Sequence, residues 1–297
     1  MKNIVKNILI TSVVLCGTGI VLYGAGNLLG GKEYVKAANL NRLDGTAMRG
    51  EPDGVKQMEK TKIDDFEKLD IDFNDIDFNI KPSDDENYYL EYTLEGDEGG
   101  TPKKNPFTYE KTGDTLKMRE KGGATSSSYM KIDIGVLSDI LGEETIQEYK
   151  NEVTLYVPAD QNISGTIKMG DGELDAKSVK IDRMEVAMEY GDVTLEGVKM
   201  KDSKVTTDDG DLELNVAAFE GTNKIHTAYG DIEISLTEAD ATALNIECST
   251  KYGDLDIAEE LKGNMCVSDD ESTYEKTGDK SAGKLEITTS DGDISVK

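Results

Sequence analysis

The sequence predicts an all-β protein: a short parallel β-solenoid with coils of about 20 residues, preceded by an N-terminal β region and one transmembrane helix. The main observation is a recurring phrase of glycine, aspartate, an apolar residue, any residue and a second apolar residue. Its glycines are Gly170, Gly191, Gly210, Gly230, Gly253 and Gly292. The first five lie 19 to 23 residues apart, and the last follows after 39 residues, about two periods. Repeats of this length are typical of stacked coils that share one core.

Residues on both sides of each glycine alternate between apolar and polar, which predicts two short strands per coil. With the six glycines aligned, the positions two and four residues later face inward, as do those three and five residues earlier. In the first copy these positions are Gly172 and Leu174 after Gly170, and Ile167 and Gly165 before it. The Gly-Asp pair predicts a bend, because glycine adopts positive φ and aspartate bonds local backbone groups.

Two degenerate copies extend the repeat. Ser272 takes the place of the glycine inside the 39-residue gap, with Val267 and Tyr274 inward, so that seven coils follow one another from Gly170. Asn74 takes that place in an earlier copy, because asparagine tolerates positive φ better than most residues. The inward residues of the Asn74 copy are Leu69, Ile71, Ile76 and Phe78.

Other alternating segments define the layout before the coils. A strand is expected over 88–94, a hairpin over 107–120 about Gly113-Asp114, and a strand over 153–157 that Pro158 ends. The predicted domains are a transmembrane signal anchor at 1–31, a polar tether at 32–60, an N-terminal β region at 61–157 and the β-solenoid repeats at 158–297.

The N-terminal segment predicts attachment to a membrane. Lys2 and Lys6 precede an uncharged run whose apolar body, Ile8 to Leu29, is 22 residues long. A helix of that length spans about 33 Å, enough for a bilayer. We expect an uncleaved anchor; the alternative is a cleaved signal peptide with its site near Ala37. Because short N-terminal tails usually stay inside, the soluble part is expected outside, as a single-pass protein of the cell membrane.

Composition argues against two function classes. The formal net charge is −27, from 60 acidic and 33 basic residues, and such a field repels nucleic acid. Paired carboxylates carry no catalytic information in so acidic a chain, and a polysaccharide-cleaving β-helix would need aromatic subsites. The chain has no Trp and 6% aromatic residues. We therefore expect no enzyme, no catalytic residues and no bound cofactor.

The aspartates of the repeat form a candidate cation edge. If the coils stack, neighbouring carboxylates lie about 5 Å apart and repel each other, which a bound Ca²⁺ would relieve. The candidate ligands are Asp192, Asp209, Asp211, Asp231 and Asp254. The alternative is that each aspartate satisfies its own turn and faces water.

Tyr190, Tyr229 and Tyr252 each stand just before a repeat glycine. They form either an exposed strip that binds sugar or protein, or a packing ladder at the corner of the coils. The single histidine, His226, falls on the outward side of its strand. Cys248 is expected inward and Cys266 outward, so no disulfide joins them.

The chain resembles a known family in three places: Phe66-Glu67-Lys68-Leu69-Asp70-Ile71, Val153-Thr154-Leu155-Tyr156-Val157-Pro158, and the Gly-Asp coils. It is similar to the bacterial putative-adhesin family of unknown function, which includes LiaG-like envelope proteins, over roughly residues 61–297. The resemblance implies a β-solenoid-like domain and, often, a membrane anchor.

Together these observations predict a non-catalytic, membrane-anchored, extracytoplasmic surface or interaction protein of a bacterial envelope. Its expected partners are the membrane, through the N-terminal helix, and an envelope protein or wall polymer. The alternatives are an accessory regulator of envelope-stress signalling and a calcium-dependent binding module.

Overall fold

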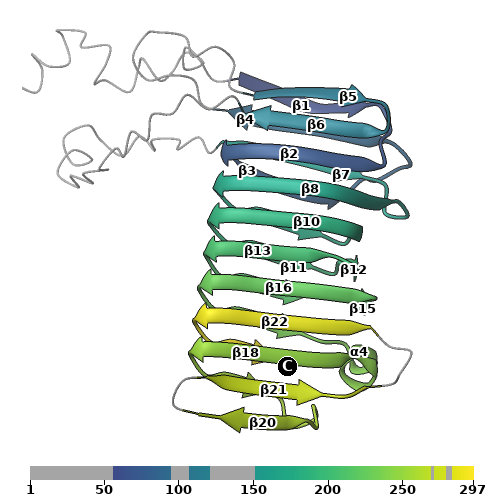
Figure 1. Ribbon diagram of the computed structural model, residues 1–297. Helices are drawn as coiled ribbons and strands as arrows, with labels where there is room; N and C mark the ends of the chain where they lie inside the picture. Colours follow the sequence, from purple (N-terminus) through teal and green to yellow (C-terminus); the bar gives the residue numbers. More distant parts are fainter. Residues whose placement is uncertain (1–55, 95–106, 121–150, 269–270, 279–282) are drawn as a thin grey trace, which may run out of the picture. The chain divides into compact units, whose positions relative to one another are not determined.

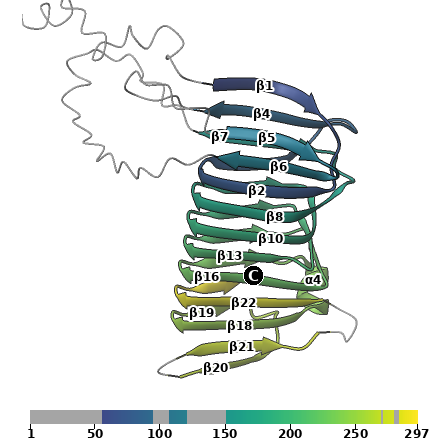
Figure 2. The same cartoon turned by 45° about the horizontal axis from the view of Figure 1, so that its top comes forward.

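The computed structural model describes residues 56–94, 107–120, 151–268, 271–278 and 283–297. These residues lie in one compact unit and form two β-sheets that face each other (Figures 1 and 2). The all-β class and the coils of about 20 residues are therefore confirmed.

The first sheet, sheet A, has ten strands in the order β1-β4-β7-β3-β9-β11-β14-β17-β23-β19. Their bounds in that order are Lys56–Ile63, Tyr88–Leu94, Glu152–Val157, Asp77–Pro82, Leu174–Lys177, Val193–Glu196, Leu212–Asn215, Ile232–Ser235, Ile294–Val296 and Leu255–Ile257.

The second sheet, sheet B, has thirteen strands, eleven of them in the order β20-β21-β18-β22-β16-β13-β10-β8-β2-β6-β5. Their bounds in that order are Asn264–Val267, Ser272–Lys276, Asn245–Tyr252, Lys284–Asp291, Thr222–Tyr229, Lys204–Asp209, Lys180–Tyr190, Asn162–Asp171, Lys68–Asp75, Thr115–Glu120 and Phe107–Thr112. Two short strands, β12 (Lys199–Lys201) and β15 (Ala218–Glu220), extend it beside β10. A short helix, α4 (Glu238–Ala243), lies between β17 and β18.

The coils stack as parallel strands in register. Val186 of β10 lies opposite Val205 of β13, which lies opposite Ile225 of β16. All three side chains are buried, as the period-two alternation predicts. Each fully buried aliphatic side chain contributes about 1.5–3 kcal/mol relative to its exposed state, so the inward faces supply the driving force for stacking.

Threonines replace aliphatic residues at one inward position, and three of them bond the bend of a neighbouring coil. The Thr227 hydroxyl donates to the carbonyl oxygen of Gly210 at 3.1 Å, and the Thr250 hydroxyl to that of Gly292 at 2.8 Å. Thr289 bonds Gly230 in the same way at 3.3 Å. These three buried hydroxyls therefore have the partners that a buried polar group requires, whereas the Thr207 hydroxyl at the same position of β13 has none among the described residues.

The bends need glycine because the coils approach closely there. Gly191 has φ of +121°, and a Cβ built on it would lie 1.9 Å from the carbonyl oxygen of Gly172. Gly210 has φ of +153°, and its Cβ would lie 2.1 Å from the carbonyl oxygen of Gly191. Both the dihedral and the contact exclude a side chain, which confirms the predicted bend at these two positions.

The register of the first coil differs from the expected one by two residues. Leu174 lies opposite Val193, so Gly172 rather than Gly170 matches Gly191. The reason is burial: in the observed register Leu174 and Ala176 are buried, whereas the expected register would place the side-chain-free Gly172 inward.

The last coil does not stack where its sequence position suggests. Strand β22 pairs with β16 on one side and β18 on the other, and β23 lies between β17 and β19 in the same way. In Figure 1 the yellow β22 lies between the green strands β16 and β18. The C-terminal coil is therefore inserted between two coils that are consecutive in the sequence.

The coil expected around Ser272 is wrong. Strand β21 pairs antiparallel with β18 and forms a hairpin with β20 at the end of sheet B. Tyr274 is buried as expected and donates its hydroxyl to Leu261 at 2.7 Å, but Val267 is 69% exposed. Because β22 already pairs with one edge of β18, β21 pairs with the other edge and ends the sheet there together with β20.

The strands of the N-terminal β region share both sheets with the coils. The Asn74 copy is present: β2 pairs with β8 and β3 with β9, and Leu69, Ile71, Ile76 and Phe78 are all buried. The β5–β6 hairpin is confirmed. Strand β1 begins at Lys56, inside the expected tether, because it pairs with β4 and covers the edge of sheet A.

No helix among the described residues is long and apolar enough to cross a membrane. The expected span at residues 8–29 lies outside the described residues, as does the tether up to residue 55.

Candidate functional site

A row of exposed side chains follows the ends of the sheet B strands, just before the bends. Tyr190 lies opposite Asp209, Asp209 opposite Tyr229, Tyr229 opposite Asp291, and Asp291 opposite Tyr252. We call these five residues the tyrosine–aspartate row. Aromatic and acidic side chains alternate along it at every strand step.

The tyrosines of this row are 58%, 60% and 65% exposed. They therefore do not form the packing ladder that was one of the two expectations. Successive tyrosines are two strand steps apart, about 9.6 Å, too far for their rings to stack directly. Exposed aromatic rings on a rigid sheet edge are typical of contact surfaces rather than of cores.

Asp291 belongs to this row only because β22 is inserted beside β16. The sequence places Asp209 between Tyr190 and Tyr229 but gives no sign that Asp291 separates Tyr229 from Tyr252. The place of Asp291 in the row depends on the order of the strands in sheet B, which no local sequence pattern indicates.

The repeat aspartates form a second feature, a hydrogen-bonded ladder across the coils. Asp192 Oδ1 accepts the backbone N–H of Asp211, and Asp211 Oδ1 accepts that of Asp231, each at 2.8 Å. The ladder continues through Asp293 to Asp254 with bonds of the same length. The carboxylates of Asp192, Asp211, Asp231 and Asp293 thus bond the neighbouring coil, whereas Asp171 accepts the N–H of Gly172 in its own turn at 2.9 Å.

Four of the five candidate cation ligands lie on this ladder, and Asp209 lies in the tyrosine–aspartate row instead. Asp293, which the sequence did not single out as a ligand, separates Asp231 from Asp254. Within the described ranges, no three His, Cys, Asp or Glu side chains are placed to hold a metal ion. The cation edge stays a prediction.

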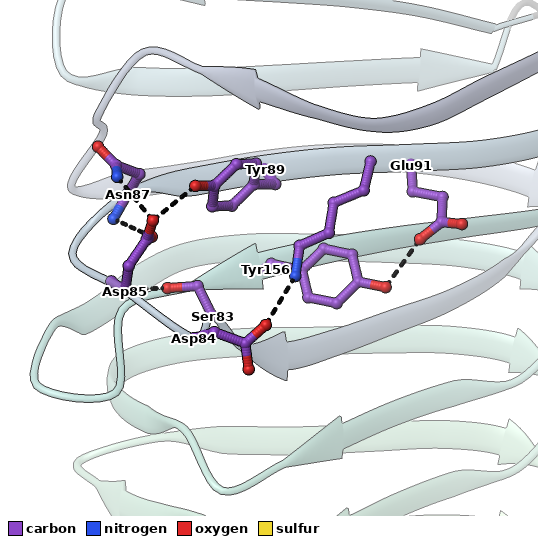
Figure 3. A network of polar contacts seen from close by, with 8 residues as sticks. Ser83, Asp84, Asp85, Asn87, Tyr89, Glu91 and Tyr156 are labelled. Carbon is purple, nitrogen blue, oxygen red and sulfur yellow. Dashed lines mark hydrogen bonds and ion pairs between the residues drawn. The ribbon is translucent and has the colours of Figure 1, made fainter.

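A third feature is a polar network on the outer face of sheet A, where β1, β4, β7 and β3 adjoin (Figure 3). The Tyr156 hydroxyl donates to Glu91 at 2.7 Å, and burial together with that carboxylate raises the pKa of Tyr156 to about 12. Lys60 Nζ lies 4.0 Å from the centre of the Tyr156 ring and 3.3 Å from Asp84.

Asp85 closes the same network beside the β3–β4 turn. It accepts the Tyr89 hydroxyl at 2.7 Å and the backbone N–H of Asn87 at 2.8 Å. These bonds hold the pKa of Asp85 below its usual value, the Tyr89 bond being the largest cause. Because bonds within the chain already engage these groups, the network joins β1, β4, β7 and the β3–β4 turn more than it presents free ligands.

An open polar depression of about 220 Å³ lies next to this network. It is lined by Lys81, Glu91, Tyr92, Thr93, Glu152, Thr154 and Tyr156. Glu152 already accepts bonds from Asn79 at 2.9 Å and Thr154 at 3.3 Å. Sequence reasoning missed this depression, because its residues come from strands that are distant in the chain.

Nucleophilic chemistry has little support among the described side chains. Cys248 is buried, and desolvation raises its pKa to about 12, so its thiol stays protonated. Cys266 is exposed, and both cysteines are free, as expected. His226 lies on its strand's outward side with Nδ1 2.8 Å from the Thr288 hydroxyl, a contact between neighbouring strands.

Comparison with solved structures finds distant likenesses. A "putative cell adhesion protein" from Clostridium sporogenes is 14% identical, with a TM-score of 0.45 over 82% of this chain and 99% of that one. A "putative adhesin" from Bacteroides fragilis is 13% identical, with a TM-score of 0.41 over 82% and 97%. A "putative lipid binding protein" from Parabacteroides distasonis is 15% identical, with a TM-score of 0.27 over 82% and 97%.

No functionally curated protein matches the chain. One family model matches residues 66–215 and again residues 164–297, which together cover most of the chain. This match confirms the resemblance expected from the Gly-Asp coils and the segments before them. The chain belongs to the Toastrack DUF4097 family.

Proposed function

We propose that this protein is a non-catalytic interaction module, held at the bacterial cell membrane by residues 1–31 with its coils outside. The observation that carries the proposal is the tyrosine–aspartate row. Three tyrosines about 60% exposed stand at fixed intervals on a sheet whose in-register strands hold them in place. Leaving aromatic rings in water is unfavourable, and such surfaces commonly contact a partner.

The proposed mechanism is display. The apolar run from Ile8 to Leu29 would anchor the chain, and residues 32–55 would carry the coils away from the bilayer. A net charge of −27 would keep the module soluble and away from anionic lipid. Its partner would be another envelope protein or a wall polymer.

The test is release of the coils from intact cells. A recognition sequence for a specific protease is inserted after Gly50, and the protease is added to osmotically stabilised cells without a wall. We expect the coils to appear in the medium before lysis. A chain without the inserted sequence is the control and should stay with the cells. Release only after lysis would place the coils inside and overturn the proposal.

A further inference from the structure

Two carboxylates in the tyrosine–aspartate row each lie between two aromatic side chains. Asp209 lies between Tyr190 and Tyr229, and Asp291 between Tyr229 and Tyr252. Among the described residues, neither carboxylate is engaged in an ion pair or a side-chain hydrogen bond within the chain. Both are therefore available to a group that comes from outside.

A carboxylate flanked by aromatic rings favours a cation. The face of a tyrosine ring attracts an ammonium or guanidinium group, and the carboxylate adds full charge at the same place. The chain itself provides an example at the end of the row, where Lys251 Nζ lies 5.4 Å from the centre of the Tyr252 ring. The net charge of −27 attracts cations to the whole surface.

We propose that the tyrosine–aspartate row binds a lysine- or arginine-rich segment of a partner protein, with one cationic side chain seated over Asp209 and one over Asp291. This inference rests on the proposed function, because it names the class of partner for the same surface. A polyanionic wall polymer would be repelled by the two carboxylates. A neutral glycan would use the rings but leave both charges unpaired.

The spacing of the row makes the partner more specific. Asp209 and Asp291 are two strand steps apart, about 9.6 Å. In a polyproline II segment, side chains three residues apart lie on one face at about 9.3 Å. In a β-strand, side chains two residues apart are separated by only about 6.8 Å. The row therefore fits a segment in polyproline II conformation with a cation at every third residue.

The experiment measures peptide binding to the purified full-length chain in a nonionic detergent. One peptide repeats Lys-Pro-Pro four times. A second has the same composition with its lysines in two adjacent pairs separated by four prolines, so that no two lysines are three residues apart. We expect the evenly spaced peptide to bind about tenfold more tightly, because only it places two cations at once. Equal binding of the two peptides would contradict the spacing argument.

Two variants that remove equal charge distinguish binding at the tyrosine–aspartate row from attraction by the net negative charge of the chain. D209N/D291N should weaken the evenly spaced peptide about tenfold, as expected when two cation contacts are lost. The control, E213Q/D256N, also removes two negative charges, but from the outer face of sheet A, where both residues are exposed. It should change affinity less than about twofold at physiological salt. An equal loss of affinity in the two variants would show that the peptide responds only to net charge and would contradict a site at the row.

Tyr229 offers a further variant, because it flanks both carboxylates and is 60% exposed. Y229S should weaken binding while leaving the thermal unfolding midpoint unchanged. Binding of a neutral β-linked oligosaccharide in place of either peptide would overturn the inference in favour of a glycan. Because this assay uses purified protein, its failure is distinguishable from failure of release from intact cells.

Discussion

Asp211 both donates and accepts a hydrogen bond across the stack of coils. Its backbone N–H bonds Asp192, and its carboxylate accepts the N–H of Asp231, each at 2.8 Å. The aspartates of neighbouring coils repel one another, and these bonds to backbone N–H groups offset that repulsion. The repeated aspartate therefore links two coils wherever its carboxylate accepts the backbone N–H of the aspartate in the neighbouring coil.

Replacing Asp211 tests this role. D211A should lower the free energy of unfolding by about 1 kcal/mol, because the N–H of Asp231 loses its acceptor. D211N keeps an acceptor oxygen and removes a repulsive charge, so it should stay within about 0.5 kcal/mol of the native chain. Urea unfolding of both variants measures the difference. Equal loss in D211N would show that the charge, not the acceptor, matters.

Ile225 tests the inward register. Its side chain is 1% exposed and lies opposite Val205 and Ile287. I225D should prevent folding of the coils, because an unpaired charge would be buried, and I225A should cost about 2–5 kcal/mol. Thermal unfolding followed by circular dichroism checks both. Normal unfolding of I225D would contradict the register. K224Q at the adjacent exposed position serves as the control, because it removes only a surface ion pair with Glu286.

At this scale the sequence predicts burial well and bonding poorly. The period-two pattern correctly predicts that Ile225 and Val205 face inward, because side-chain direction in a strand is a local property. The partner of each aspartate is not local: Asp231 bonds Asp293, which is 62 residues away. Only the order of the coils determines that pairing.

Among the elements, the inserted pair β22 and β23 has the largest structural consequence. Strand β22 provides both β16 and β18 with a parallel neighbour, and β23 does the same for β17 and β19. Without them, two halves of the stack would have no hydrogen-bonded contact through these strands. The C-terminal segment therefore joins coils that precede it in the chain.

A chain that ends at Gly283 tests this role. We expect the segment from β18 to β21 to unfold in this truncated chain. Without β22 and β23, the edge of β18 that pairs with β22 and the inward apolar side chains of β18 would be exposed to water. Limited proteolysis with mass spectrometry should yield a resistant fragment that ends near Ser235. If residues 245–276 stayed resistant to the protease in the truncated chain, the last coil would only extend the end of the stack, and the proposed role would be wrong.

The sequence predicts the existence of each coil but not this order. The phrase at Gly292 is the same as in other copies, so it contains no information about which coils lie beside it. The spacing predicts a coil around Ser272, yet β21 runs antiparallel to β18. Spacing detects a period, whereas strand direction depends on the connection between strands.

The whole molecule carries a net charge of −27, and much of its surface is acidic. Self-repulsion of this kind destabilises a compact state and is screened by salt. The thermal unfolding midpoint should therefore rise when NaCl increases from about 0.01 M to 0.15 M, as the screening length falls from about 30 Å to 8 Å. A midpoint independent of salt would contradict this.

The same titration tests the candidate cation edge. CaCl₂ and NaCl compared at equal ionic strength separate specific binding from screening. A larger rise with CaCl₂ that D211N abolishes would support calcium at the aspartate ladder. Identical midpoints would remove the calcium-dependent module from consideration.

The order of the coils underlies both the tyrosine–aspartate row and the function proposed for it, and cysteine cross-linking tests it most directly. In a C16S/C266S background, Y229C/D291C places two thiols on adjacent strands, within the separation that a disulfide spans. Y229C/Y252C places them two strand steps apart, about 9.6 Å, beyond that limit. Under mild oxidation, we predict an intramolecular disulfide in the first variant and none in the second. The reverse result would mean that the coils stack in sequence order and that the row does not exist.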